Sequence, residues 1–264
     1  MPIRPPNAPP SASLMRRVED AGLNASAPPQ QALVDGWLLR LSPGHAKRSR
    51  CINALQRGQL PLDILLARCR AVFEASGLPL IVRITPFTQP HNLDDELALR
   101  GWHRFDETQV LIRQDLSGAA AAPLPAGMHL LPVGPARYAE VVGHLRGNRP
   151  EEIAAHFERL AASPVPYQGH VLLDRSERLL ACGQLALEEG LAGLYDIFTP
   201  PEARRRGFAR LLCQALLTRA AAQGALHAYL QVSADNQPAL ALYAGLGFQP
   251  AYGYHYRSER PLPA

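Results

Sequence analysis

Three arginines stand directly before a glycine and an apolar run in RRRGFARLL, residues 204–212. The preceding residues 191–199 are typical of a strand, which must end at Pro200 and Pro201 because proline cannot donate to a central ladder. Apolar residues then recur at helical spacing on one face: Phe208, Leu211, Leu212, Ala215 and Leu216. The stretch therefore predicts a strand, a short loop and a helix that begins at the glycine.

The start of this predicted helix is suited to bind an anion. A first helical turn exposes unpaired N–H groups and the positive end of the dipole, and Gly207 has no Cβ to keep a phosphate away. Ala209 keeps the next turn uncrowded, and Arg204, Arg205 and Arg206 add charge from the loop. A pyrophosphate fits better than a nucleic-acid backbone, because a net charge of +4 gives no broad basic face. A solvated basic helix start is the alternative, although arginines there oppose the dipole.

A second stretch whose residues could take part in chemistry follows at residues 231–248, QVSADNQPALALYAGLGF. Its order is strand, loop, helix, glycine and aromatic. Asp235 or Asn236 can cap the helix, and Pro238 suits its first turn. Tyr243 lies one step round from the apolar face, so these residues alone leave two roles open: a reactive phenol, or a core tyrosine with a satisfied hydroxyl.

Together the two stretches resemble the GCN5-related N-acetyltransferases (GNAT). The family signature R/Q-x-x-G-x-G/A is matched by Arg204-Arg205-Arg206-Gly207-Phe208-Ala209. A second signature, an Asn followed by an LY and a GF pair, is matched by Asn236, Leu242-Tyr243 and Gly247-Phe248. The resemblance covers about residues 125–264. It implies transfer of an acetyl group from acetyl-CoA, the cosubstrate, to a primary amine by direct attack in a ternary complex.

The resemblance also implies roles for single residues. The loop Arg204 to Ala209, with Gly207 and Phe208, would hold the pyrophosphate of acetyl-CoA. Backbone groups of Ile197, Phe198 and Thr199 would pair with the pantetheine arm like an added strand, and Asn236 would hydrogen-bond that arm. Tyr243 would protonate the departing thiolate as general acid. Holding the amine against the carbonyl gives most of the rate, and a backbone N–H that polarises the carbonyl gives more.

The base and the acceptor pocket are less specified. Asp196 is a carboxylate on the predicted strand, but alternation sends it to the face opposite Tyr195. In the resembling enzymes the face of Tyr195 and Gly193 looks toward substrate, so we expect Asp196 to be structural. Proton loss through water is the alternative. Tyr254, His255 and Tyr256, on the last predicted strand, could line the acceptor pocket.

Composition divides the chain. Residues 1–30 are rich in Pro, Ala and Ser, which predicts a partly disordered tail. The uncharged segment 118–127 predicts a linker. After it we expect a strand at 129–133, one or two helices at 136–162, strands at 170–175, 179–189 and 191–199, a helix to about 223, a strand at 227–232, a helix at 237–246 and a strand at 252–257. This order predicts a complete mixed α/β catalytic domain at 128–264.

The segment 31–117 predicts a strand at 36–41, a helix at 61–75, a strand at 80–86, a helix at 93–99 and a strand at 108–112. This repeats the order seen after the arginines, and LALRGWHRF echoes LYAGLGFQP. We therefore predict two GNAT-like mixed-sheet domains in tandem, the first degenerate. Gln56-Arg57-Gly58 lacks the signature spacing and no LY pair exists, so the first copy is not expected to bind CoA. An unrelated α/β domain is the alternative.

Composition also limits the function classes. The four cysteines form no CxxC pair and no histidines have ligand spacing, so we expect no metal. Neither a signal peptide nor a run of ~20 apolar residues is present, which predicts a cytoplasmic protein without a membrane partner. Besides the acetyltransferase, a non-catalytic acyl-CoA-binding regulatory module and, less favoured by the modest charge, a nucleic-acid binder remain open. A homodimer is also left open.

Overall fold

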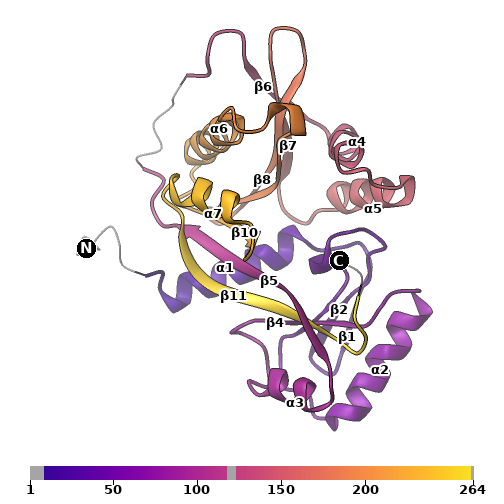
Figure 1. Cartoon of the computed structure of the whole chain (residues 1–264). Coiled ribbons are helices and arrows are strands. Elements are labelled where there is room, and N and C mark those ends of the chain that lie inside the picture. Colours follow the sequence, from indigo (N-terminus) through magenta and orange to yellow (C-terminus); the bar gives the residue numbers. More distant parts are fainter. Residues whose placement is uncertain (1–8, 118–122, 263–264) are drawn as a thin grey trace. The chain divides into compact units, whose positions relative to one another are not determined.

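The computed structural model describes residues 9–117 and 123–262 (Figure 1). Two compact units divide the chain, and each takes residues from several parts of the sequence. The first, here called the arginine-loop unit, comprises Met1–Ala25, Gln109–Gly134 and Val165–Tyr252. The second, the companion unit, comprises Ser26–Thr108, Pro135–Pro164 and Gly253–Ala264. Parts of the predicted tail and linker, residues 1–8 and 118–122, lie outside the described residues.

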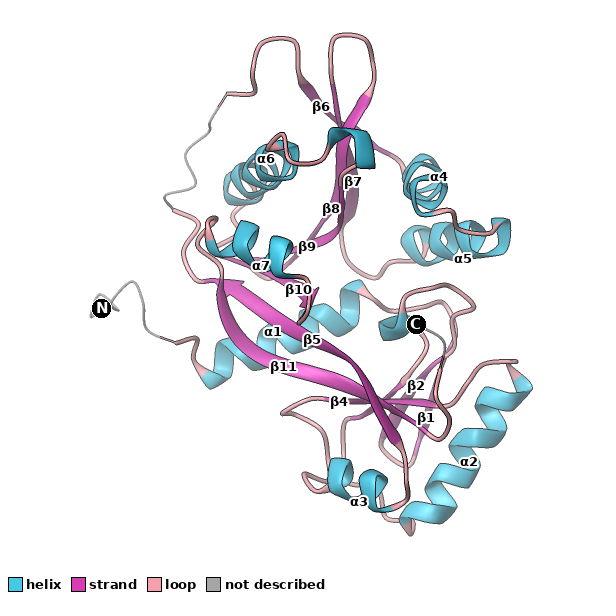
Figure 2. Ribbon diagram, viewed as in Figure 1, coloured by secondary structure: helices cyan, strands magenta, loops and turns pink. Residues whose placement is uncertain are grey.

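A mixed sheet forms the centre of the arginine-loop unit (Figure 2). Its strand order is β11-β5-β10-β9-β8-β7-β6, in which β6 to β9 are antiparallel and β10 is parallel to β9. The elements are α1 (Ala12–Ala25), the end of β5 (His103–Arg113), β6 (His129–Val133), β7 (Tyr167–Leu173), β8 (Leu179–Glu188), β9 (Leu191–Phe198), the short 3-10 helix η2 (Pro201–Ala203), α6 (Phe208–Ala222), β10 (His227–Ser233), α7 (Gln237–Ala244) and the start of β11 (Gln249–Ser258).

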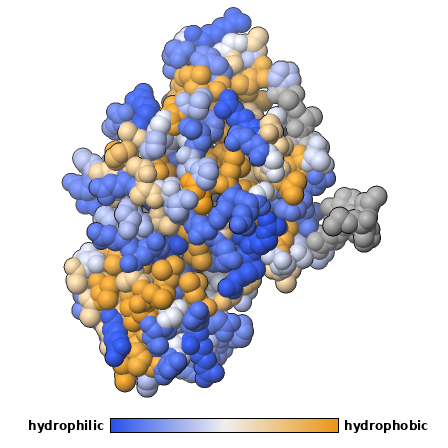
Figure 3. Space-filling view, turned by 180° about the vertical axis from the view of Figure 1, so that it is seen from behind, coloured by the Kyte–Doolittle hydropathy of each residue, from blue (hydrophilic) through white to orange (hydrophobic). Residues whose placement is uncertain are grey.

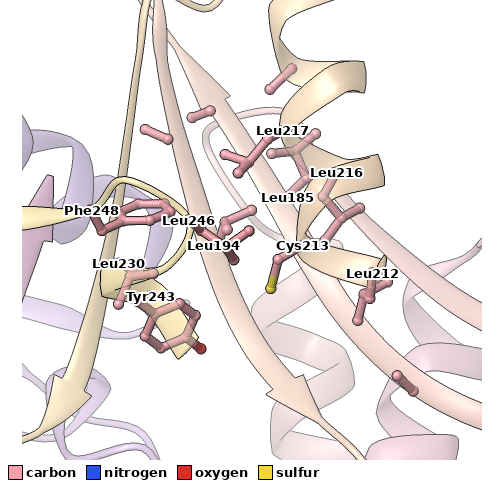
Figure 4. Packing of buried hydrophobic residues seen from close by; sticks show 14 of the residues in the cluster. Leu185, Leu194, Leu212, Cys213, Leu216, Leu217, Leu230, Tyr243, Leu246 and Phe248 are labelled. Carbon is pink, nitrogen blue, oxygen red and sulfur yellow. The ribbon is translucent and has the colours of Figure 1, made fainter. Parts of the chain in front are cut away.

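Helix α6 covers one face of this sheet. Its buried residues are Phe208, Leu212, Cys213, Leu216, Leu217 and Ala220. They join a core with alternate residues of the strands, including Leu185, Ala192, Leu194 and Leu230 (Figure 4). Helix residues spaced about 3.6 apart thus pack against every second residue of the strands. The buried stripe is rotated slightly from the predicted one, because Leu211 and Ala215 lie at its half-buried border.

The strands of the companion unit are part of the same 11-stranded sheet, and their order is β1-β2-β3-β4-β11. Pairs β1–β2, β2–β3 and β4–β11 are antiparallel, and β3–β4 is parallel. Its elements are β1 (Gln31–Val34), β2 (Trp37–Arg40), η1 (Lys47–Ser49), β3 (Ile52–Ala54), α2 (Leu62–Ala75), β4 (Ile81–Ile84), α3 (Leu93–Leu99), the start of β5, α4 (Pro135–Arg146), α5 (Pro150–Ala161) and the end of β11.

A separate apolar core supports the companion unit. Trp37, Ile52 and Val82 of its strands pack with Leu66 and Phe73 of α2. The unit also exposes large apolar side chains on several different elements: Leu33 on β1, Ile64 on α2, Leu99 on α3 and Phe157 on α5. Apolar residues gather on part of the surface drawn in Figure 3.

Most predicted elements are present with shifts of a few residues, but no helix was predicted in the first 30 residues. The tail contains α1, a 14-residue helix. Leu14, Val18, Ala21 and Ala25 lie on one buried stripe of that helix. Strands β1 and β3 were also not predicted, because runs of four and three residues carry too little periodicity. The predicted linker at 118–127 does not separate the two compact units, because each unit takes residues from both sides of it. That the two halves of the chain repeat one fold stays a prediction.

Residues 9–117 and 123–262 contain neither a membrane-spanning helix nor a metal-binding cluster. No helix in these ranges combines the length and apolar character that crossing a membrane requires. No group of three His, Cys, Asp or Glu side chains in them is arranged to hold a metal ion.

The helix α1 generates a first prediction. Val18 is 0% exposed, so Val18→Ala is expected to lower the free energy of unfolding by about 2 kcal/mol through lost burial and a small cavity. Arg16→Ala is the matched control, since its side chain is 51% exposed. Urea denaturation of the full chain measures both. Equal, small effects of the two changes would show that this segment does not fold onto the protein.

A second prediction concerns acid stability. His170 of β7 is 2% exposed, with Nδ1 3.2 Å from the carbonyl oxygen of Gln168 and Nε2 3.4 Å from Nη1 of Arg219 on α6. Burial, and then the charge of Arg219, lower the pKa of His170 to about 4. The folded state therefore stays neutral at pH values where the unfolded chain binds a proton, so stability falls as the pH drops from about 6.5 toward 4.

The loss from His170 should approach about 3 kcal/mol at the acid end. Urea denaturation at several pH values, with His170→Gln as the non-titrating variant, measures it. The pH dependence should be shallower in the variant, and identical slopes in the two proteins would contradict the assignment to His170.

Candidate functional site

The loop between β9 and α6 leaves backbone donors unpaired at the helix start. Gly207 is the N-cap with φ +82°, and the helix has no side-chain cap. The first hydrogen bond of α6 runs from the N–H of Leu211 to the carbonyl of Gly207, at 3.0 Å. Within the described residues, the N–H groups of residues 207–210 therefore have no hydrogen-bond acceptor. Apart from chain neighbours, no atom lies within 4 Å of the place of a Gly207 Cβ, so this helix start is open.

Arginine side chains surround this opening. Arg204 donates from Nε to the carbonyl oxygen of Thr199 at 3.2 Å, and its guanidinium lies 5.9 Å from the ring of Phe198. These contacts tie the loop to the end of β9. The guanidinium of Arg206 lies 4.8 Å from the ring of Phe208. Arg205 and Arg206 are exposed and make no salt bridge to a described residue, so their charge is available to a ligand.

The strand before the loop separates from its parallel neighbour. Pairing of β9 with β10 ends at Leu194 and Leu230, although both strands continue. Figure 4 shows the two strands that carry these leucines diverging. On its other side β9 stays paired with β8 as far as Phe198. Beyond Leu194, the edge of β9 on the β10 side is therefore not paired with β10. The backbone of Ile197, Phe198 and Thr199 follows along this edge.

A β-bulge accompanies the divergence. The register of β8 with β9 shifts between Cys182 and Gln184, and Asp196 has a left-handed φ of +49°. The extra residue changes the alternation, so Ile197 packs against the α6 core. Gly183 permits this, since a Cβ there would stand 2.5 Å from Cδ1 of Ile197. Asp196 therefore lies at the bulge, half-buried, rather than in a regular strand as the alternation argument assumed.

Helix α7 positions Asn236 and Tyr243. Asn236, and not Asp235, is the N-cap: its Oδ1 accepts from the N–H of Ala239 at 3.2 Å. Tyr243 is 8% exposed, packs edge-on against Phe248 and lies with Cys213 in the same core (Figure 4). Burial, and then the Cys213 thiol, raise the pKa of Tyr243 above its usual value.

The hydroxyl of Tyr243 makes no hydrogen bond among the described residues. This disfavours the interpretation of Tyr243 as a core tyrosine with a satisfied hydroxyl. Because its raised pKa keeps the phenol protonated at neutral pH, the residue has the state that a proton donor needs.

A group of tyrosines occupies the sheet face opposite α6. The hydroxyls of Tyr195 and Tyr229 are 3.0 Å apart, and the ring of Tyr167 lies 5.5 Å from that of Tyr195. Gly193 makes room for them, since a Cβ there would stand 2.6 Å from Tyr195 and 2.7 Å from Tyr229. Sequence analysis singled out Tyr195 and Gly193 but missed Tyr229. The alternation of HAYLQV, residues 227–232, was the signal that could have found it.

The three aromatic residues predicted for the acceptor pocket belong to the companion unit. There His255 lies with Nε2 2.9 Å from Asp94, and the pKa of Asp94 is lowered by hydrogen bonds from Arg257 and His255. Tyr254 and Tyr256 pack edge-on, with ring centres 5.7 Å apart. Their role in an acceptor pocket stays a prediction.

Comparison with known proteins agrees with this geometry. Residues 136–248 match the model of the Acetyltransferase (GNAT) family. Over these residues the chain is similar to the GNAT family. The uncharacterized N-acetyltransferase YobR of Bacillus subtilis is 26% identical over 87% of this chain and 92% of its own. These similarities support acyltransferase activity for this chain.

Solved GNAT structures share the fold. A GCN5-related N-acetyltransferase from Kribbella flavida has a TM-score of 0.65 at 16% identity, over 93% of this chain and 95% of its own. A tandem GNAT protein from the clavulanic acid biosynthesis pathway has a TM-score of 0.62 at 19% identity, over 92% of this chain and 88% of its own. The mixed α/β sheet is thus the GNAT fold.

The GNAT loop generates a third prediction. Gly207→Ala meets no crowding, so its cost should come from the left-handed φ of +82° alone, about 1–2 kcal/mol of unfolding free energy. Gly134→Ala is a matched control, because the space around Gly134 is also open and its φ lies outside the left-handed region. Urea denaturation should show a loss for Gly207→Ala only. An equal effect of both substitutions would mean that the loop does not need this conformation.

Proposed function

We propose that this protein transfers the acetyl group of acetyl-CoA to a primary amine by direct attack in a ternary complex. The observation that carries the proposal is the start of α6: unpaired N–H groups and exposed arginines follow directly after the segment in which β9 leaves β10. A pyrophosphate joined to a long polar arm needs both features, an anion site and a free strand edge. The family match supports the same ligand.

Each part of acetyl-CoA has residues that suit it. The segment Arg204 to Ala209 would receive the pyrophosphate on the N–H groups of the first turn. The backbone of Ile197, Phe198 and Thr199, beyond the end of the β9–β10 ladder, would hydrogen-bond the pantetheine arm. Asn236 uses its Oδ1 to cap α7, which leaves its side-chain NH₂ as the group that could donate to the arm.

The chemical step needs little from the protein beyond positioning. The neutral amine nitrogen attacks the thioester carbonyl, a C–N bond forms and the C–S bond breaks. Tyr243 gives its proton to the departing thiolate and recovers one from water, while the amine loses its proton to water. A backbone N–H on the free edge of β9 would stabilise the developing oxyanion. Asp196 is not assigned as the base, because it lies at the bulge.

We also propose that residues 31–117 are a degenerate GNAT-like copy, joined by 118–127 to the catalytic domain at 128–264. The repeated crossover supports this: α2 connects the parallel pair β3–β4 as α6 connects the parallel pair β9–β10. In both halves a short helix and a strand follow. Between β3 and α2 the chain has Gln56-Arg57-Gly58 in place of the arginine signature, so this copy is proposed not to bind CoA. Similarity to a tandem GNAT structure adds support.

A fourth prediction tests the acetyltransferase function. Arg206→Ala should weaken acetyl-CoA binding about tenfold in calorimetry, because one charge-assisted contact to the pyrophosphate is lost. Arg175→Ala is the control, since Arg175 is an exposed arginine of the same unit on the β7–β8 turn. Tyr243→Phe should keep the affinity but lower CoA release with an amine panel roughly a hundredfold, because the proton donor is lost.

Three results would contradict or redirect this proposal. No heat of acetyl-CoA binding at high micromolar concentration would overturn it. Binding that survives Tyr243→Phe without turnover of any amine would point to a non-catalytic acyl-CoA-binding module. Affinity for nucleic acid that falls steeply with salt and is not competed by CoA would assign the arginines to that ligand.

A further inference from the structure

A buried amide near the divergence of β9 has no partner. Gln184, in the middle of β8, is 0% exposed, and neither its Oε1 nor its Nε2 makes a hydrogen bond. Burying an amide without a partner costs free energy, and native proteins satisfy nearly all such groups. An apolar residue of similar size would fill this position in the strand at lower cost. The amide is therefore retained against stability.

The position of Gln184 relates it to the reaction. It pairs directly with Tyr195 of β9, the first residue after pairing with β10 ends. One strand spacing, about 4.8 Å, thus separates the backbone of Gln184 from that of Tyr195. Leu185 of β8 and Leu194 of β9 belong to the α6 core, so alternation places Gln184 and Tyr195 on the opposite face.

A glycine and several aromatic rings surround Gln184. On one side it pairs with Gly169 of β7 and on the other with Tyr195. Tyr195 contacts the rings of Tyr167 and Tyr229, with ring centres 5.5 and 6.0 Å away. The amide is accordingly the hydrogen-bonding group of a buried cluster of aromatic rings beside a glycine.

We propose that Gln184 selects the acceptor of this enzyme, and that the acceptor is an amine carrying a neighbouring amide, as in an aminoacyl amide or a peptide N-terminus. A primary amide offers both donors and an acceptor. Another amide satisfies both kinds of group, whereas a carboxylate leaves Oε1 without a donor and an alkylammonium leaves Nε2 without an acceptor. Planar amides also pack well on tyrosine rings. This inference rests on the proposed acetyl transfer.

The experiment compares aminoacyl amides with matched alkylamines that lack the amide, using CoA release from acetyl-CoA. The unaltered enzyme should favour the aminoacyl amides by about tenfold or more in kcat/KM. Gln184→Met, similar in size and apolar, should raise the KM for aminoacyl amides about tenfold more than the KM for alkylamines. The variant should also melt at a higher temperature, since the buried unpaired atoms are gone.

Gln168→Met is the matched control. Gln168 is an exposed residue of β7 whose Nε2 donates to Val133 and Gly169 carbonyls, so its substitution should not change the preference. An unchanged preference in Gln184→Met, or equal turnover of both amine classes by the unaltered enzyme, would overturn the inference while acetyl transfer stands. Failure of acetyl-CoA to bind would overturn the proposed function itself.

Binding gives a second readout if turnover is slow. Calorimetry with the same aminoacyl amides in the presence of CoA should show weaker binding to Gln184→Met than to the unaltered enzyme, by about tenfold. Equal dissociation constants for the two proteins would overturn the role of Gln184.

Discussion

The parallel pairing of β9 with β10 ends at Leu194 and Leu230, and the site depends on this limit. A strand that stayed paired along both edges would have no backbone groups for a ligand. The bulge at Asp196 lets β9 bend while its other edge remains in register with β8 as far as Phe198. One strand therefore packs in the core and also has an edge beyond the β10 ladder, and the loop after it places the arginines at the end of that edge.

Core packing determines where the anion site lies. Phe208, Leu212 and Leu216 hold α6 against β8 and β9, so the direction of its first turn is set by buried contacts rather than by the loop. The loop itself opposes stability. Arginines beside a positive helix end and N–H groups without acceptors are both unfavourable in the absence of an anion. Because the whole buried stripe holds α6 in place, the protein can tolerate these two unfavourable contributions to its stability at the first turn of the helix.

The sequence allowed prediction of what depends on local residue types. Long apolar patterns placed α2, α3 and α6, and the order Arg-x-x-Gly-x-Ala placed the loop with its glycine at the helix start. Other features depend on contacts between distant residues. The bulge at Asp196 arises from the register with β8, and α1 was hidden in a proline-rich context because burial of Val18 comes from the tertiary fold. In the sequence, Gln184 is only one polar residue in an apolar strand. The structure shows that its buried amide has no hydrogen-bond partner.

Backbone strain is present where the proposed function lies. Asp35, Glu177 and Glu189 also have positive φ, but each stands in a turn between two strands, where such conformations are common, and Asp106 has a positive φ within β5. Asp196 instead lies at the bulge near the end of β9 and Arg205 in the loop before α6, with φ of +49° and +60°. Strain of this kind persists only where the surrounding structure enforces it. The paired edge with β8 enforces it at one end and the buried stripe of α6 at the other, so the connecting segment holds its shape before a ligand arrives.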